Sequence, residues 1–273
     1  MCFSVLMSVY IKERPEYLEA CLKSLSEQTL MADEVVLVED GVITSDLSLV
    51  IEKYRSQLNI VSVCLANNVG LAAALNEGLK ICTYELVARM DTDDLAVPFR
   101  FEKLVEYFRE YPDLDILGSY AQDLSDDNVL GMIREMPLAH KSIYKNLFCC
   151  PFIHPSVMYK KSFIDSIGGY DEKLARRQDY DLWFRCGLQN ARFSNLPLVL
   201  LQYRFTEGTH SRQSRIMLLR QGLIGFNGVW QLKQPIWKGL GAFLPFIRSF
   251  LPGRLEHKLY IVLKRLDPRR RVK

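Results

Sequence analysis

The sequence predicts an α/β protein with one mostly parallel sheet flanked by helices and a helical extension at the C-terminus. Two observations predict the sheet: apolar runs of strand length alternate with amphipathic helical stretches, and polar clusters follow several of these runs. The extension is predicted because the chain changes character after Ser211 and becomes helical, apolar and basic. With 273 residues, 49% of them hydrophobic and 25% charged, the chain can bury a sizeable core.

Five apolar runs in the first half of the chain are predicted strands. They are nearly continuous hydrophobic segments, which suits strands that are buried on both faces of a parallel sheet. In chain order they cover residues 3–10, 34–38, 60–65, 84–90 and 116–121.

Helices are predicted between these strands, because apolar residues spaced three and four apart form one stripe on a helix surface. Pro15 opens the first helix and Pro98 the fourth, since proline is tolerated at the first helical position. Asn68 is expected to cap the third helix. The apolar stripes are Leu18, Leu22 and Leu25, then Leu49, Ile51 and Tyr54, then Leu71, Leu75 and Leu79, and finally Phe101, Leu104 and Phe108.

The second half of the chain is less regular. Its predicted loops are a polar hairpin or loop at residues 123–131 and a turn at 168–169. Its predicted helices and strands cover residues 139–148, 156–159, 179–188, 198–204 and 216–226.

Charge and cysteine content exclude several classes of protein. A net charge of +3 is too small to indicate nucleic-acid binding. The seven cysteines are scattered without a CxxC pair, which excludes an obvious zinc site and fits a reducing cytoplasm. No Lys/Arg-led signal peptide opens the chain and no run of about eighteen apolar residues occurs, so neither a signal peptide nor a membrane-spanning helix is expected.

Three carboxylates lie within four residues, at Asp91, Asp93 and Asp94, directly after an apolar run. In an extended strand Asp91 and Asp93 would point one way and Asp94 the other. Like charges this close repel one another unless a cation or hydrogen-bond donors offset them. Mg²⁺ or Mn²⁺ is a natural partner, because a hard cation is commonly held by one or two carboxylates plus substrate phosphates. Taken alone, the stretch fits a solvated Asp-rich turn or helix cap equally well.

Two further polar clusters follow predicted strands, at residues 8–10 and 39–41, and ligands of open α/β sheets bind beyond the carboxyl ends of the strands. Asp40 can accept a hydrogen bond from the imide N–H of a base, although a turn residue ahead of Gly41 is the simpler interpretation. Residues 67–70 open a predicted helix whose N-terminus favours anions, or else form a plain N-cap. Neither GxGxxG nor GxxxxGK[ST] occurs, so a dinucleotide fingerprint and a P-loop are both absent.

In their order and spacing, these motifs resemble those of glycosyltransferase family 2. The fold of that family is GT-A, a single Rossmann-like, mostly parallel sheet flanked by helices, and the resemblance runs from about residue 3 to about residue 211. The matching stretches are Ser8-Val9-Tyr10, Val38-Glu39-Asp40-Gly41, Asn68-Val69-Gly70-Leu71 with Asn76 and Gly78, Ala88-Arg89-Met90-Asp91-Thr92-Asp93-Asp94 with Pro98 and Arg100, His154-Pro155-Ser156, Gly168-Gly169-Tyr170-Asp171, and Gln178-Asp179-Tyr180-Asp181-Leu182-Trp183.

The resemblance implies a GT-A domain over residues 1–211, and the amphipathic extension then covers 212–273. Within the domain, the nucleotide-sugar half would span about 1–122 and the acceptor half about 123–211.

The resemblance also implies roles for the residues of the nucleotide-sugar half. Asp40 would read the base, Asp91 would contact the donor near the ribose, and Asp94 would orient the donor or a water on the metal. Asp93, together with Asp91, would ligate Mn²⁺ or Mg²⁺ on the diphosphate, and His210 falls where some GT-A enzymes have a late metal contact. The full implied donor set is Ser8, Val9, Tyr10, Asp40, Asn68, Gly70, Asp91, Thr92 and Asp94.

On the acceptor side the resemblance implies that Asp179 is the general base, preceded by Gln178 where the family more commonly has Glu. Trp183 would wall the acceptor site, and His154 would lie near the acceptor or donor sugar. The attacking hydroxyl needs a base, and a single carboxylate opposite the leaving group gives one displacement with inversion. From the residues alone, an N-cap role for Asp179 and a base role for Asp181 stay open.

The extension combines apolar with basic residues. Residues 236–250 are apolar, contain Lys238 and Arg248, and are broken by glycine and proline, whereas residues 255–266 carry an apolar stripe with lysine and arginine around it. Amphipathic segments of this kind lie in membrane interfaces, where basic residues attract anionic lipid. We therefore expect peripheral membrane contact through the C-terminus. A helical pair packed on the domain is the alternative.

The resemblance implies an inverting, metal-dependent hexosyltransferase of bacterial O-antigen or capsule biosynthesis, cytoplasmic and peripheral on the inner face of the cell membrane. UDP-galactose or UDP-glucose is the expected donor, and a polyprenyl-diphosphate-linked saccharide is the expected acceptor. A sugar nucleotidyltransferase is one alternative, although residues 11–15 lack the glycine-rich opening loop that it would want. A catalytically inactive carbohydrate- or nucleotide-binding protein is another, against which the intact Asp93 and Asp179 argue.

Overall fold

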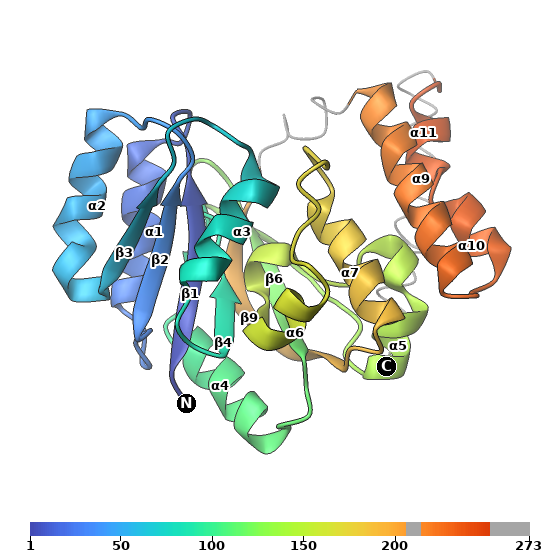
Figure 1. Ribbon diagram of the computed structural model, residues 1–273, viewed down its shortest axis with the longest axis horizontal. Coiled ribbons are helices and arrows are strands. Elements are labelled where there is room, and N and C mark those ends of the chain that lie inside the picture. The colour runs from blue at the N-terminus through green and yellow to red at the C-terminus, as the bar shows by residue number, and fades with distance from the viewer. Residues whose placement is uncertain (206–213, 252–273) are drawn as a thin grey trace.

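The computed structural model describes residues 1–205 and 214–251, and nine strands of this part form one sheet (Figure 1). Their order across the sheet is β3-β2-β1-β4-β8-β6-β9-β5, and β7 pairs with β6 beside this path. The strands are β1 (Phe3–Val9), β2 (Glu34–Glu39), β3 (Ile60–Cys64), β4 (Leu86–Arg89), β5 (Leu95–Ala96), β6 (Ile116–Leu124), β7 (Leu130–Arg134), β8 (Met158–Lys160) and β9 (Phe193–Arg204).

The first four strands run in one direction. β1 is parallel to both β2 and β4, and β2 is parallel to β3, so their carboxyl ends lie at one edge of the sheet. β8 is antiparallel to β4 and to β6, while β6 and β9 are parallel. The predicted α/β class with a mostly parallel sheet is therefore confirmed.

Helices cover both faces of this sheet, because alternate strand residues point to opposite sides. On one face Phe3, Val5 and Met7 of β1 pack with α1, α2 and α4; on the other, Leu6 of β1 packs with α3, and α6 and α7 lie on the same side. The helices are α1 (Pro15–Ser26), α2 (Ser45–Leu58), α3 (Leu71–Ile81), α4 (Arg100–Glu110), α5 (His140–Lys145), η1 (Leu147–Cys149), η2 (His154–Ser156), α6 (Lys161–Ser166), α7 (Gln178–Leu188), α9 (Arg215–Gln231), α10 (Ile236–Gly241) and α11 (Leu244–Arg248).

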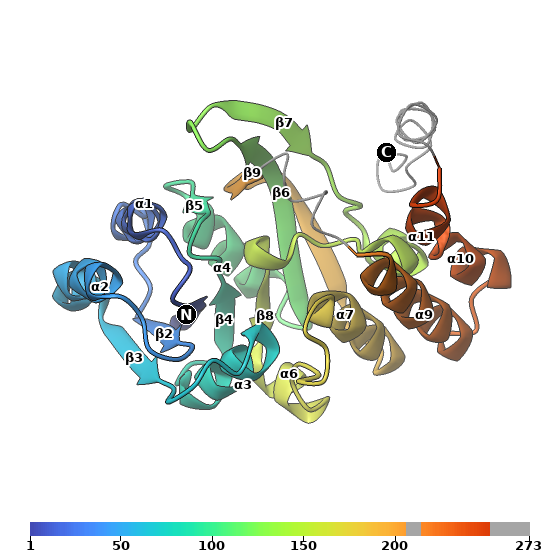
Figure 2. The same cartoon turned by 90° about the horizontal axis from the view of Figure 1, so that it is seen from above.

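Most predicted elements exist, and their limits differ from the prediction in a few places. Pro15 does occupy the first turn of α1, whereas α4 begins at Arg100, two residues after Pro98. β9 starts at Phe193, five residues before the predicted 198, and it passes through Pro197 with a shift of register against β6. The polar segment 123–131 is a hairpin, since it joins β6 to the exposed strand β7 (Figure 2).

The prediction that Asn68 caps α3 was wrong. The N-cap of α3 is Gly70, which has a φ of 90° and offers no side chain. The backbone N–H groups of Val69 and Gly70 instead donate to the carboxylate of Asp40, at 2.7 and 3.1 Å. The end of β2 therefore supplies the acceptor that begins α3.

The C-terminal helices α9, α10 and α11 pack together beyond α7, at one end of the molecule (Figures 1 and 2). A Cβ atom at Gly228 of α9 would lie only 2.3 Å from the ring of Phe184 on α7, so glycine allows the two helices to approach closely. Lys238 of α10 is buried and donates to the carbonyl of Lys145, at 2.6 Å. Part of the extension thus packs on the domain, whereas the predicted 211/212 boundary and the helix at 255–266 fall outside the described residues.

Among the residues that the structure describes, no helix combines the length and the apolar character that crossing a bilayer requires.

Candidate active site

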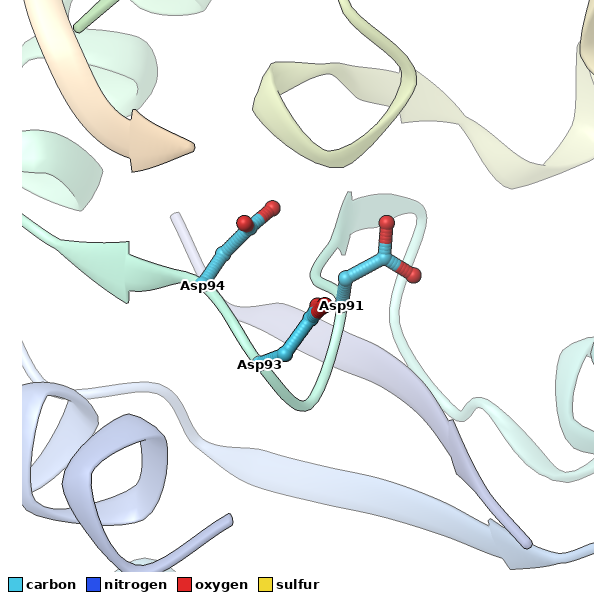
Figure 3. Close-up of side chains that lie close together, drawn as sticks. All are labelled: Asp91, Asp93 and Asp94. Carbon is cyan, nitrogen blue, oxygen red and sulfur yellow. The ribbon is translucent and has the colours of Figure 1, made fainter. Parts of the chain in front are cut away.

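The three aspartates lie at the carboxyl edge of the sheet, in a turn that follows β4 (Figure 3). One carboxylate oxygen of each of Asp91, Asp93 and Asp94 can be chosen so that all three lie within 4.8 Å of one another. The predicted alternation, with Asp94 facing away from the other two, was wrong because the strand ends at Arg89 and the chain turns. The turn gathers three acceptors around one small volume.

Asp94 is fully buried beneath this volume. Its Oδ1 accepts a 2.7 Å hydrogen bond from the backbone N–H of Arg204, at the end of β9, and its Oδ2 has no hydrogen-bond partner. Burial, together with the charges of Asp93 and Asp91, raises the pKa of Asp94 well above its usual range. Arg204 also donates through Nε to the carbonyl of Asp93, at 2.8 Å, so the end of β9 fixes the shape of the turn.

Burial raises the pKa of Asp93 to about 7, and the carboxylates of Asp91 and Glu13 add to the effect. Glu13 is held beside the turn because the hydroxyl of Thr92 donates to it, at 2.5 Å. Thr92 is itself buried, so its side chain is used to position Glu13.

The donor set fits a hard divalent cation. It consists of carboxylate oxygens alone, one of them is buried without a partner, and their mutual repulsion is the condition that a cation relieves. Asp91, Asp93 and Asp94 are the described residues that could hold it. His210, the other predicted ligand, lies outside the described residues.

Arg89, the last residue of β4, places a positive charge behind the cluster. Its side chain is 1% exposed, and its guanidinium forms an ion pair with Asp91. The buried Arg100 supports it by donating from one nitrogen to the carbonyls of Arg89 and Pro155, each at 2.7 Å. The carbonyl of Pro155 lies next in the chain to His154, which packs against Trp183 of α7. Arg100 thereby ties the end of β4 to the segment on which α7 packs.

The predicted base-reading residue, Asp40, is buried at the end of β2. Besides the two backbone bonds to residues 69 and 70, its carboxylate accepts a 3.0 Å hydrogen bond from the side chain of Asn68. Gly41 has a φ of 84°, and a Cβ atom there would lie 2.7 Å from the nitrogen of Asn68, so the loop can approach only because position 41 is glycine. Asp40 thus holds the 68–70 loop, and recognition of a base by Asp40 stays a prediction.

The predicted donor residues at the end of β1 face different environments. Tyr10 is exposed at the carboxyl edge and Ser8 is half-buried, whereas the side chain of Val9 is buried in the core. The carbonyl of Val9 accepts from the backbone N–H of Asp40, at 2.8 Å. Contact between the side chain of Val9 and a donor is therefore excluded in this structure.

Asp179 lies in the first turn of α7, where Arg177 precedes the helix with a left-handed φ of 66°. The side chain of Asp179 is half-buried, and the loss of hydration on burial raises its pKa. The alternative base, Asp181, is used elsewhere, since it accepts a 2.7 Å hydrogen bond from Nε of Arg185. The carboxylate of Asp179 lies 3.9 Å from the thiol of Cys150, and its role as a base stays a prediction. Gln178 beside it is buried, and its Oε1 has no hydrogen-bond partner.

Two predicted substrate residues are core residues in the structure. Trp183 is fully buried and packs against Phe152 and His154, so its predicted place in the wall of the acceptor site is not seen. His154 is also buried, and its Nε2 lies 2.8 Å from the hydroxyl of Tyr170. Burial and the charge of Arg89 lower the pKa of His154, so it is a neutral member of the layer behind the site.

Sequence reasoning gave no role to Glu13, Arg89 or Arg204, which surround the Asp cluster. A signal for Arg89 was present, because a lone charge at the end of an apolar strand needs a partner. No such signal exists for Glu13 or Arg204, because both are distant from the Asp cluster in the chain and meet it only after folding.

The fold and the site together define a class of protein. The chain superposes on S. aureus TarS 1-349 in complex with UDP-GlcNAc with a TM-score of 0.69 and 24% identity, covering 92% of this chain and 73% of that one. Mannosyltransferase PcManGT from Pyrobaculum calidifontis, solved with GDP-Man and Mn²⁺, matches with a TM-score of 0.63 and 15% identity over 97% of this chain and 79% of that one. The fold is the GT-A fold of glycosyltransferases.

The family follows from the sequence. The model of glycosyl transferase family 2 matches residues 4–168, and this chain belongs to that family. It is a glycosyltransferase, as the resemblance implied.

Three relatives show where such proteins act. An uncharacterized glycosyltransferase of Haemophilus influenzae is 40% identical over 95% of this chain and 98% of its own length. The amylovoran biosynthesis glycosyltransferase AmsE of Erwinia amylovora is 41% identical over 74% of this chain and 76% of its own. The UDP-Gal:alpha-D-GlcNAc-diphosphoundecaprenol beta-1,3-galactosyltransferase of Escherichia coli is 36% identical over 78% of each. The chain thus has homologues in bacterial polysaccharide biosynthesis.

Proposed function

We propose that this glycosyltransferase moves a hexose, galactose or glucose, from a UDP-sugar to a saccharide linked through a diphosphate to a polyprenyl lipid. The E. coli relative, named for UDP-Gal and a diphosphoundecaprenol acceptor, supports this choice of donor and acceptor. The product would enter a bacterial surface polysaccharide such as O-antigen or capsule.

One observation carries the proposal. Arg89 pairs with Asp91 of the carboxylate cluster, and Arg100 ties Arg89 to Pro155, beside His154, against which Trp183 of the Asp179 helix packs. In this proposal, a cluster that would bind a charged donor and a carboxylate suited to proton transfer therefore lie on elements that pack together. This juxtaposition is what transfer from a nucleotide diphosphate to a hydroxyl requires.

Asp91, Asp93 and Asp94 would hold Mn²⁺ or Mg²⁺ in this proposal, with the diphosphate of the donor completing the shell. A bound cation would stabilise the negative charge that builds up on the departing diphosphate. Ser8, Tyr10 and the loop that Asp40 holds would bind the nucleoside.

Asp179 would accept the proton of the attacking hydroxyl. Its half-buried setting suits that task, because a raised pKa makes a carboxylate a stronger base. With a single carboxylate on the acceptor side, the reaction would be one displacement, and the anomeric configuration of the sugar would invert.

The acceptor also bears on where the protein works. A lipid-linked saccharide lies at a membrane surface, so we propose cytoplasmic, peripheral attachment at the inner face of the cell membrane through the C-terminal extension. The division into a GT-A domain over 1–211 and an extension over 212–273 belongs to the same proposal.

The test uses the purified full-length chain, Mn²⁺ and a synthetic GlcNAc-diphospholipid acceptor. UDP-galactose, UDP-glucose, UDP-N-acetylglucosamine and GDP-mannose are compared as donors, and the product is analysed by mass spectrometry and by NMR for its anomeric configuration. We expect transfer from UDP-galactose or UDP-glucose with inversion. Transfer with retention, or from GDP-mannose alone, would contradict the proposal.

A further inference from the structure

Helix α9 has two apolar faces. Its inner face is lined by Gly222, Gly225 and Gly228, where Cβ atoms would meet Phe243, Tyr180 and Phe184. Its outer face carries Ile216, Leu219, Leu223 and Trp230, spaced three, four and seven apart as on one side of a helix. We call these four residues the α9 stripe. An apolar stripe on a helix is normally covered by a partner, and the four side chains of this stripe are 36–68% exposed among the described residues.

The α9 stripe continues into a groove between α9 and α7. This groove has a volume of about 710 Å³, and it is lined by Phe184 and Leu188 of α7 and by Leu223, Ile224 and Trp230 of α9. Trp230 and Leu223 belong to both features and are 68% and 54% exposed. The outer surface of the two helices therefore combines the exposed stripe with a groove whose lining includes several apolar side chains.

Helices α9, α10 and α11 contribute charges of one sign. The charged residues of positions 214–251 are Arg215, Arg220, Lys233, Lys238 and Arg248, without a single Asp or Glu. Lys238 is buried against α5, but Arg215, Arg220 and Lys233 are exposed. On the α7 side of the groove, Asp181 is paired with Arg185. An apolar surface whose exposed charges on and directly after α9 are cations complements an anionic, partly apolar partner.

We propose that the α9 stripe, with the α7/α9 groove and the basic residues beside it, docks on an anionic lipid bilayer. Leucine and isoleucine side chains would enter the acyl boundary, Trp230 would lie at the headgroup level, and Arg220 and Lys233 would contact phosphates. Since no described helix can span a bilayer, the attachment is interfacial. The inner face of α9 packs on α7, so the docked surface is fixed relative to the catalytic domain.

This inference rests on the proposed function, which includes a lipid-linked acceptor, and adds the surface through which the protein would meet the membrane. α7 lines the groove with Phe184 and Leu188 and carries Asp179 in its first turn. Docking through α9 therefore brings the helix with the proposed base to the membrane. A saccharide on a lipid diphosphate would then be presented to the site from the bilayer surface.

The first test is co-sedimentation of the full-length chain with vesicles, without donor or acceptor. Vesicles of phosphatidylcholine with phosphatidylglycerol are compared with vesicles of phosphatidylcholine alone. The double variant Ile216→Gln/Leu223→Gln should lose at least about tenfold in affinity for the anionic vesicles. Arg220→Gln/Lys233→Gln should lose roughly thirtyfold, because each basic residue near anionic lipid contributes about 1 kcal/mol. Leu49→Gln on α2, where the leucine is 69% exposed, is the matched control and should bind as the wild type does.

The second test uses tryptophan fluorescence. Of the three tryptophans, Trp183 is buried, so a Trp237→Phe variant leaves Trp230 as the exposed one. Its emission should shift to the blue when anionic vesicles are added, and the further change Trp230→Phe should abolish the shift. All variants must first show the melting temperature of the wild type.

Three outcomes would overturn the inference. Stripe variants that sediment as well as the wild type would show that the bilayer is not the occupant. Trp230 emission that is already blue and resists acrylamide without vesicles would show that the chain itself covers the stripe. A dimer that Leu223→Gln dissociates would show that a second copy does. Since no sugar is present, vesicle binding is independent of whether the proposed transfer reaction is correct.

Discussion

Arg89 occupies the last position of β4, after Leu86, Val87 and Ala88. Burying a guanidinium costs several kcal/mol unless a carboxylate and hydrogen-bond acceptors oppose it, and its ion pair with Asp91 provides such opposition. Burial raises the pKa of Asp179, and the charges of Arg177 and Arg89 oppose this rise. At the scale of single residues, the site is thus a balance between buried acids and the buried guanidinium groups of Arg89 and Arg100.

The role of Asp179 can be tested by the change Asp179→Asn. This substitution keeps the shape of the side chain but removes its basicity, so transfer should fall by roughly 10²- to 10⁴-fold while donor affinity stays unchanged. Rates of sugar transfer and donor binding by calorimetry measure the two effects separately. Asp181→Asn is the control, because Asp181 is paired with Arg185. If the Asp181 variant loses more transfer than the Asp179 variant, the base has been misassigned.

The raised pKa of Asp93 predicts how stability changes with pH. A carboxyl whose pKa is about 7 in the folded protein, against about 3.9 in the unfolded chain, keeps its proton more readily when folded. Without metal, the free energy of unfolding should therefore fall as the pH rises from about 4 to about 7. Melting temperatures in EDTA across this range measure the effect. Asp93→Asn should flatten the slope, and an equally steep slope in that variant would contradict this explanation.

Residue types were more predictable than residue roles. The sequence pattern indicated the Asp cluster, because three carboxylates directly after an apolar run are conspicuous, whereas Asp179 was predicted only from the family resemblance. It misplaced Trp183, since a tryptophan next to a site is buried or exposed according to tertiary packing. Nor could spacing show that Asp40 would bind the loop at residues 68–70, which it meets only after folding.

At the scale of elements, continuous apolar runs marked the buried parallel strands well, because such strands are hydrophobic on both faces. β5 has two residues and β7 is exposed along its length, so neither has a pattern that separates it from a loop. The start of α3 was misjudged because the loop before it is fixed by hydrogen bonds from the N–H groups of Val69 and Gly70 to Asp40, which follows β2 and is distant in the chain. Where local sequence propensity was ambiguous, contacts between residues distant in the chain therefore determined whether an element formed and where it began.

The packing of α9 on α7 can be tested at Gly228. A Cβ atom there would lie 2.3 Å from the ring of Phe184, so Gly228→Ala should destabilise the protein by about 1–3 kcal/mol through overpacking. The shift in the midpoint of urea unfolding measures this loss. Gly241→Ala at the end of α10 is the control, since nothing lies within 4 Å of the added carbon. Equal midpoints for the two variants would show that the helices do not pack as closely as described.

At the scale of the whole molecule, the sheet edge gathers residues that are far apart in the chain. Glu13 follows β1, the Asp cluster follows β4, Arg204 ends β9 and Asp179 lies in the first turn of α7. The order of the motifs made the family and the fold predictable. The charged residues that neighbouring strands place around the cluster could not be predicted, because their positions depend on the pairing of β9 with β6 and on the turn after β4.

The central claim is that the carboxylate cluster holds a divalent cation against the diphosphate of a nucleotide. Calorimetric titration of UDP into the wild type and into Asp93→Ala, with and without Mn²⁺, tests it most directly. We predict that Mn²⁺ strengthens UDP binding by the wild type and that Asp93→Ala abolishes this gain while metal-free binding is kept. If Mn²⁺ strengthens binding equally in both proteins, the cation is not held by this cluster.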